Sequence, residues 1–216
     1  YGATALDKNV LNDSLDLYFA ADYHFLVDGP IMYNQPDTLT KNIAGAEILI
    51  SVFSPQKVVS ANDIMENIED LMVAQSNYLG GTLPVKKYAY LIYLMDYPSL
   101  SKGMGALEHS YSSFYTLPES VADQLPQFVR DVAAHEFFHI ITPLSIHSEQ
   151  IHNFNYINPE MSQHLWLYEG VTEYNSMHMQ VQQGLYDSET FLEEVQEKIT
   201  NASAYPLVSF TEMSQK

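Results

Sequence analysis

Two histidines and a glutamate lie close together in the stretch Asp131–Thr142, which contains the pattern H-E-x-x-H as His135, Glu136 and His139. Residues four apart on an α-helix lie above one another on the same face, so two imidazoles at this spacing can bind one metal ion. Glu136 directly follows the first ligand, so its carboxylate can accept a proton from a water on that metal. The spacing is therefore typical of a zinc hydrolase, with Zn²⁺ as the cofactor and Glu136 as general base.

The residues around the motif favour a helix, and a further ligand is needed. Pro126 suits a first helical turn, and Pro143 follows the apolar run where a helix should end. Catalytic zinc usually has three protein ligands and a water. The best candidate for the third is Glu169, beside Trp166 in a predicted helix from about Glu160 to Gln183. A carboxylate there is costly to bury unless it is paired or metal-bound, and an ordinary amphipathic-helix glutamate is the alternative.

Glu173 lies one turn beyond Glu169 on the same face of this predicted helix. Its carboxylate could accept the free ring N–H of His135 or His139, which would fix the tautomer that presents the other nitrogen to the metal. A surface glutamate is the alternative interpretation.

Several segments together resemble the glycyl aminopeptidase family of zinc peptidases. H-E-F-F-H at 135–139 precedes W-L-Y-E-G-V-T-E-Y at 166–174, and G-M-G-A-L-E-H at 103–109 is similar to the family's G-G-L-E-H segment. L-V-D-G-P at 26–30 resembles the family's entry into its catalytic domain, so the resemblance covers about residues 20–183. It implies an α+β fold, the thermolysin-like two-lobed catalytic domain of the gluzincins, with a β-containing N-terminal lobe and a helical C-terminal lobe.

The resemblance also implies an aminopeptidase that acts on short peptides. Glu108 at the closed end of a substrate cleft would pair with the free α-ammonium of the peptide. Gly103 and Gly105 would let the substrate approach the backbone closely, and Ala106, also a predicted substrate-binding residue, keeps the side chain minimal. Ala106 stands where the family has its second glycine. A first residue as small as Gly or Ala is the expected preference, whereas the segment taken alone indicates only a loop.

The elements that must position these residues are β-rich first and helical afterwards. Ala46–Phe53 and Val85–Met95 are predicted strands, and between them a helix begins after Ser60 and ends at Gly80–Gly81. Further expected elements are a short helix around Leu11–Ala20, a loop over 103–117 with an edge strand at Ser112–Thr116, and a last helix near Ser188–Ala202. Residues 1–216 are thus expected to be a single catalytic domain, with the β-containing lobe to about residue 120 and the helical lobe with the zinc site from about residue 121.

The composition is that of a folded protein and excludes several classes of partner. Hydrophobic residues make up 46% of the 216 residues and charged residues 17%. The net charge of −18 argues against a nucleic-acid-binding surface, and the absence of cysteine excludes Cys-ligated metal. No apolar run is long enough for a membrane span. The oligomeric state is not indicated, and family habit suggests a periplasmic or extracellular location in a bacterium.

Two other functions compete with the aminopeptidase. One is a zinc endopeptidase of the same fold, in which Glu108 is merely structural. The other is a zinc-binding scaffold without turnover, which would have no chemical need for Glu136. The family typically carries a β-rich domain before the catalytic one and a PDZ domain after it. Neither is seen in this sequence, so an excised catalytic portion or a shortened relative is expected.

Overall fold

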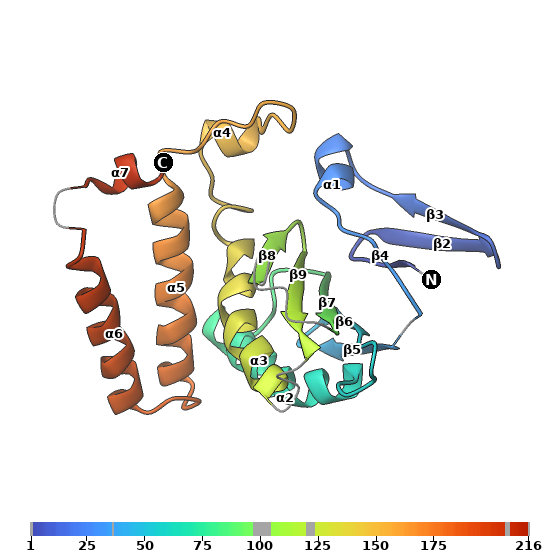
Figure 1. Cartoon of the computed structure of the whole chain (residues 1–216), viewed down its shortest axis with the longest axis horizontal. Coiled ribbons are helices and arrows are strands. Elements are labelled where there is room, and N and C mark those ends of the chain that lie inside the picture. The colour runs from blue at the N-terminus through green and yellow to red at the C-terminus, as the bar shows by residue number, and fades with distance from the viewer. Residues whose placement is uncertain (1, 36, 97–104, 120–123, 206–207, 216) are drawn as a thin grey trace. The chain divides into compact units, whose positions relative to one another are not determined.

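The computed structural model describes residues 2–35, 37–96, 105–119, 124–205 and 208–215 (Figure 1). The chain divides into two compact units, Tyr1–Phe137 and Phe138–Lys216. Among the described residues, the first unit holds all the strands and three α-helices, and the second unit holds helices and no strand. The protein is therefore a mixed α+β molecule, as the sequence predicts.

A five-stranded sheet forms the centre of the first unit. Its strand order is β5 (Asp37–Ile43), β6 (Ala46–Phe53), β7 (Lys87–Met95), β9 (Ser112–Pro118) and β8 (Gly105–His109). β6, β7 and β9 run parallel, and the outer strands β5 and β8 are antiparallel to their neighbours. β6 matches the predicted strand, and β7 begins two residues later than predicted.

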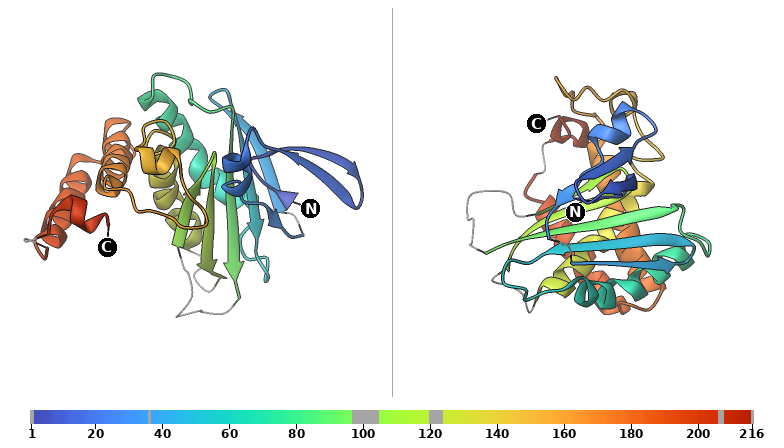
Figure 2. Two further views of the ribbon diagram at one scale, coloured as in Figure 1. Left: turned by 90° about the horizontal axis from the view of Figure 1, so that it is seen from above. Right: turned by 90° about the vertical axis from the view of Figure 1, so that its right-hand side faces the viewer.

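Both faces of this sheet are covered, which explains why residues 88–92 of β7 are all buried. Tyr88 and Tyr90 of β7 point to one face, where Tyr90 Oη donates to the sulfur of Met72 on α2 (Ala61–Tyr78). α3 (Leu125–Glu136) packs against α2 on this face (Figure 2). Ala89 and Leu91 point to the opposite face. They pack there with residues that include those of the short strands β1 (Gly2–Ala3) and β4 (Met32–Tyr33).

The expected helix around Leu11–Ala20 is wrong. The segment instead forms an antiparallel hairpin of β2 (Asp7–Asn12) and β3 (Leu15–Phe19), followed by the short helix α1 (Tyr23–Val27). Leu15, Leu17 and Phe19 alternate with Asp16 and Tyr18, which is the period of a strand and not of a helix.

The predicted loop over 103–117 is wrong for residues 105–109, which form strand β8, whereas the strand predicted at Ser112–Thr116 is present within β9. β8 and β9 are joined by the two-residue turn Ser110–Tyr111, in which Tyr111 has a φ of 57°. β9 is consequently an inner strand, and β8 is the edge of the described sheet. The side chain of Leu107 on β8 is 56% exposed, as expected at an edge.

The predicted metal-binding helix is present but tightens before its end. α3 stops at Glu136, and Phe137–Ile140 continue as a 3-10 helix. A tighter last turn is common where an α-helix ends. The division between the two units falls in this 3-10 helix.

The second unit is built around two helices. α5 (Leu165–Gln182) and α6 (Ser188–Ala202) pack together, and Gly184 follows α5 with a φ of 74° (Figure 1). α6 has the predicted bounds, and α5 begins five residues later than predicted. The remaining helices are short, α4 (Glu149–His152) and α7 (Phe210–Met213). Within the described part of the chain, no helix combines the length and apolarity needed to cross a bilayer.

Candidate functional site

His135 and Glu136 are the last two residues of α3, in the first unit. The helix end is anchored to its neighbours through backbone carbonyls. Gln75 Nε2 donates to the carbonyl oxygen of Ala134 at 3.4 Å, and Tyr88 Oη donates to that of Glu136 at 3.4 Å. Glu136 is 8% exposed, and His135 is half-buried. A buried carboxylate therefore lies on a helix end that the sheet and α2 hold in place.

The structure brings the predicted substrate residue Glu108 close to Glu136. Glu108 lies on β8 opposite Ser113, and one carboxylate oxygen of each glutamate lies within 4.8 Å of the other. Burial raises the pKa of Tyr88 far above its usual value, and the charges of Glu136 and Glu108 raise it further. The Tyr88 hydroxyl therefore remains a neutral donor at the end of α3, beside a pair of carboxylates.

The neighbouring residues of this segment are only partly described. Gly105 is exposed and begins β8, and Ala106 is half-buried opposite Tyr115. A Cβ added at Gly105 would have no heavy atom within 4 Å, so the space beside it is open. Gly103, the other glycine of the predicted substrate segment, lies outside the described residues.

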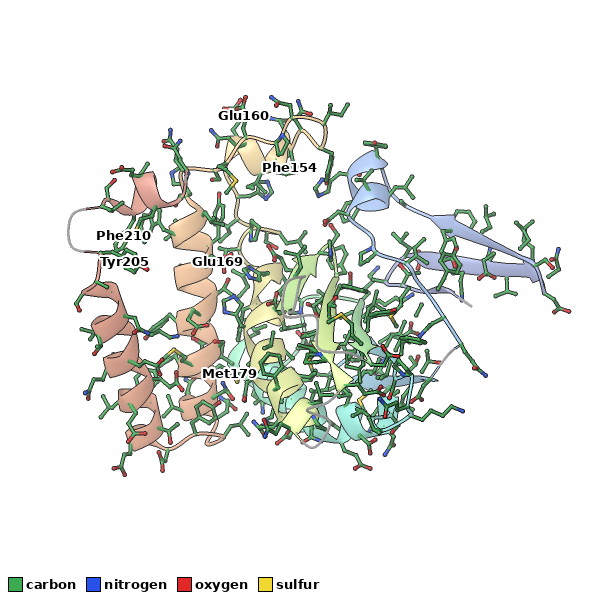
Figure 3. All side chains as sticks on the ribbon, in the orientation of Figure 1. Phe154, Glu160, Glu169, Met179, Tyr205 and Phe210 are labelled. Carbon is green, nitrogen blue, oxygen red and sulfur yellow. The ribbon has the colours of Figure 1, made fainter. Side chains whose placement is uncertain are left out.

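The second unit brings the other two predicted ligands together. His139 is buried in the 3-10 helix, and Glu169 lies near the start of α5 (Figure 3). Nε2 of His139 is 3.7 Å from Oε2 of Glu169, whose side chain is 46% exposed. A buried imidazole nitrogen thus faces a carboxylate that solvent can reach, and both are groups that could contribute to holding a metal ion.

The other ring nitrogen of His139 is held by residues that the sequence motifs do not include. Nδ1 of His139 lies 2.9 Å from the carbonyl oxygen of Thr142 and 3.4 Å from Oγ1 of Thr172. A carbonyl can only accept, so Nδ1 carries the proton in the neutral ring and Nε2 carries the lone pair. The lone pair therefore points toward Glu169, the tautomer that a metal ligand requires. In the sequence, only the helical spacing of Thr172 from Glu169 could have indicated that Thr172 lies near the ring of His139.

Glu173 forms an ion pair that the sequence did not predict. Lys198 of α6 forms an ion pair with Glu173 Oε1, and the side chain of Glu173 is 33% exposed. The sequence suggested Glu173 as the acceptor for the ring N–H of His139. In the structure, the carbonyl oxygen of Thr142 lies at that nitrogen. A role of Glu173 toward the ring of His135 stays a prediction.

Comparisons with known proteins add a family and a fold. Residues 128–215 match the family described as M61 glycyl aminopeptidase, which confirms the resemblance seen in the sequence. The fold is similar to the crystal structure of an aminopeptidase N family protein from Idiomarina loihiensis, with a TM-score of 0.79 and 18% sequence identity. That match covers 99% of this chain but 37% of the other, so the chain spans little more than a third of its length. No curated protein matches the sequence.

Proposed function

We propose, since residues 128–215 match the M61 glycyl aminopeptidase family, that the chain is the catalytic part of a zinc-dependent aminopeptidase. Short peptides are the proposed substrates, with a small first residue such as Gly or Ala. The thermolysin-like two-lobed arrangement, the single catalytic domain over residues 1–216 and a periplasmic or extracellular location are parts of the same proposal. The observation that carries it is the approach of His139 Nε2 to Glu169, directly after H-E-x-x-H.

The chemistry of the donors fits zinc. The proposed ligands are His135, His139 and Glu169, and two imidazoles with one glutamate are a ligand set of catalytic zinc. The tautomer of His139 supports this, because its Nδ1–H is directed at the Thr142 carbonyl and its Nε2, which carries the lone pair, faces Glu169. When bound, zinc supplies a Lewis acid and lowers the pKa of a water to about 7.

Glu136 and Glu108 have different roles in the proposed reaction, proton transfer and substrate binding. The Glu136 carboxylate accepts a proton from the attacking water and returns it to the amine that leaves, so the enzyme ends each cycle in its starting state. Glu108 pairs with the α-ammonium of the peptide, which places the first peptide bond at the reacting position. The closeness of the two carboxylates supports this division, because an anchored amine lies only about one residue from the bond that is cut.

The edge strand β8 offers a way to hold the rest of the peptide. β8 has β9 on one side and no described strand on the other. An extended peptide can add to such an edge through main-chain hydrogen bonds, which favours peptides without selecting most side chains. Glu108 is part of β8, so the amine anchor and the backbone site would lie on one element.

The test compares Glu136→Gln and Glu108→Ala with the wild type on one peptide that has either a free or an acetylated amine. Glu136→Gln is expected to lower kcat on the free peptide by about 10²–10⁴-fold, because the general base is lost. It should keep its zinc, as measured by mass spectrometry of the metal. Glu193→Gln, an exposed glutamate of α6, is the control and should behave as the wild type.

Glu108→Ala separates the aminopeptidase from the endopeptidase. The wild type should cleave only the free peptide, and Glu108→Ala should lose most of that activity while retaining zinc. Equal losses on free and acetylated peptides would show that Glu108 does not anchor the amine and would favour the endopeptidase. Stoichiometric zinc in a wild type that cleaves neither peptide would favour the non-catalytic scaffold.

A further inference from the structure

Two exposed histidines of the second unit lie in contact in the segment that follows the H-E-x-x-H motif. Nε2 of His147 lies 3.1 Å from Nδ1 of His152, and the ring centroids are 5.2 Å apart. His152 is the last residue of α4, and His147 lies just before that helix. We propose that His147 and His152 form a second metal site, for a divalent transition ion such as Zn²⁺, separate from the proposed catalytic residues.

The distance between the two nitrogens suits one shared ion. With zinc–nitrogen bonds of about 2.0–2.1 Å and tetrahedral angles, two ligating nitrogens lie about 3.3 Å apart. The observed 3.1 Å is within a few tenths of an ångström of that value. The rings therefore need to move only slightly for a metal ion to replace the proton of the hydrogen bond between them.

The hydrogen bonds fix which nitrogens carry lone pairs. Nδ1 of His147 lies 2.9 Å from the carbonyl oxygen of Pro143, which can only accept, so this nitrogen carries the proton and Nε2 carries the lone pair. Metal-ligating histidines commonly donate their other N–H to such a carbonyl. Nδ1 of His152 then donates to Nε2 of His147. When an ion binds, that proton leaves Nδ1, and the neutral ring takes one up at Nε2, so its charge does not change.

The exposure and the donor type define the class of ion. Both side chains are exposed, so water can fill the coordination positions that two imidazoles leave open. Imidazole nitrogen favours zinc, nickel and copper, whereas magnesium and calcium require oxygen ligands. A bound ion would join Pro143, His147 and His152 into one chain of contacts. The bound ion would thus link α4 to the segment 143–147, which follows the H-E-x-x-H motif.

The experiment counts zinc in the whole chain by equilibrium dialysis and mass spectrometry of the metal. Excess Mg²⁺ is present throughout, so that it occupies carboxylate sites on this acidic surface without competing for imidazole. The wild type is compared with His147→Ala and with His152→Ala. Each variant should bind one equivalent of zinc fewer than the wild type, or bind that equivalent at least tenfold more weakly.

His164→Ala is the matched control, because His164 is also an exposed histidine of the second unit and should leave the zinc content unchanged. Circular dichroism of every variant checks that the helices are intact. The readout is a difference of one equivalent, so it does not depend on how much zinc other sites hold. Equal zinc affinity in the wild type and in either His147→Ala or His152→Ala would overturn the proposal.

Discussion

At the residue scale, the ring of His139 depends on oxygen atoms that no metal motif contains. Its Nδ1 lies against the carbonyl of Thr142 and the hydroxyl of Thr172, which is itself 3.2 Å from the hydroxyl of Thr142. Thr172→Val removes one of these oxygens in a fully buried position without changing the volume greatly. We expect the affinity for zinc to fall by about tenfold. This is the lower end of the range seen when a residue that hydrogen-bonds to a metal-binding histidine is lost. Competition with a chelator measures it.

Thr172→Ser is the control, because it keeps the hydroxyl and should retain most of the zinc affinity. If Thr172→Val binds zinc as tightly as the wild type does, the carbonyl of Thr142 alone orients the ring. A fall of similar size in both variants would indicate that the packing of the whole threonine side chain, and not its hydroxyl alone, orients the ring.

The residue types that could do chemistry were predictable from spacing, and their supporting partners were not. H-E-x-x-H and the carboxylate at Glu169 depend on helical periodicity, which the sequence displays directly. The Thr142 carbonyl belongs to the backbone and leaves no signal in the sequence. The described ion pair of Glu173 with Lys198 depends on how α6 packs on α5, which periodicity does not fix.

At the element scale, one carboxylate holds the turn that joins β8 to β9. Asp28 accepts hydrogen bonds from the backbone N–H and hydroxyl of Ser110, both at 2.7 Å, and lies 3.0 Å from Nδ1 of His109. Burial raises the pKa of Asp28, but the hydrogen bonds from His109 and Ser110 outweigh it and hold this pKa below its usual value. The strand that carries Glu108 is thus tied to the segment after α1.

Asp28→Asn is expected to lower the free energy of unfolding at neutral pH by about 1–3 kcal/mol, since hydrogen bonds to a charged acceptor are lost. The folded-state pKa is below the unfolded one, so the carboxylate stabilises the fold above about pH 3.9. That contribution is lost as the pH falls through the folded-state pKa. Urea unfolding should therefore show a smaller difference between variant and wild type at low pH.

Asp13→Asn, at an exposed aspartate of the β2–β3 turn, is the control and should change stability little at either pH. A difference for Asp28→Asn that is the same at neutral and low pH would contradict a role for the charge. It would leave the shape of the side chain as the cause.

Elements whose apolar residues recur with one clear period were predicted well. Elements whose sequence shows no such period were not. α6 has its predicted bounds, and Ile64, Ile68 and Leu71 of α2 are fully buried, as their helical spacing predicts. The β8–β9 hairpin was missed because its turn is Ser110–Tyr111. Tyr111 there adopts a positive φ that glycine or asparagine would have signalled.

At the scale of the whole molecule, charge is the property that bears on the proposed substrate. The chain has 27 acidic and 9 basic residues, a net charge of −18. Such a surface raises the local concentration of cations, and its field reaches about 30 Å at 0.01 M salt but about 10 Å at 0.1 M. Peptides that carry lysine should therefore reach the protein more readily than neutral ones when salt is low.

We expect kcat/KM for a short peptide that begins with alanine and carries lysines beyond the first bond to fall on the order of tenfold as salt is raised from low to physiological. The same peptide with glutamines in place of the lysines should change little, and one with glutamates should improve, because screening then removes repulsion. Initial rates at a series of sodium chloride concentrations measure all of these. Parallel salt dependence for the lysine and glutamine peptides would mean that salt acts on the enzyme itself, and that the acidic surface does not select its substrates.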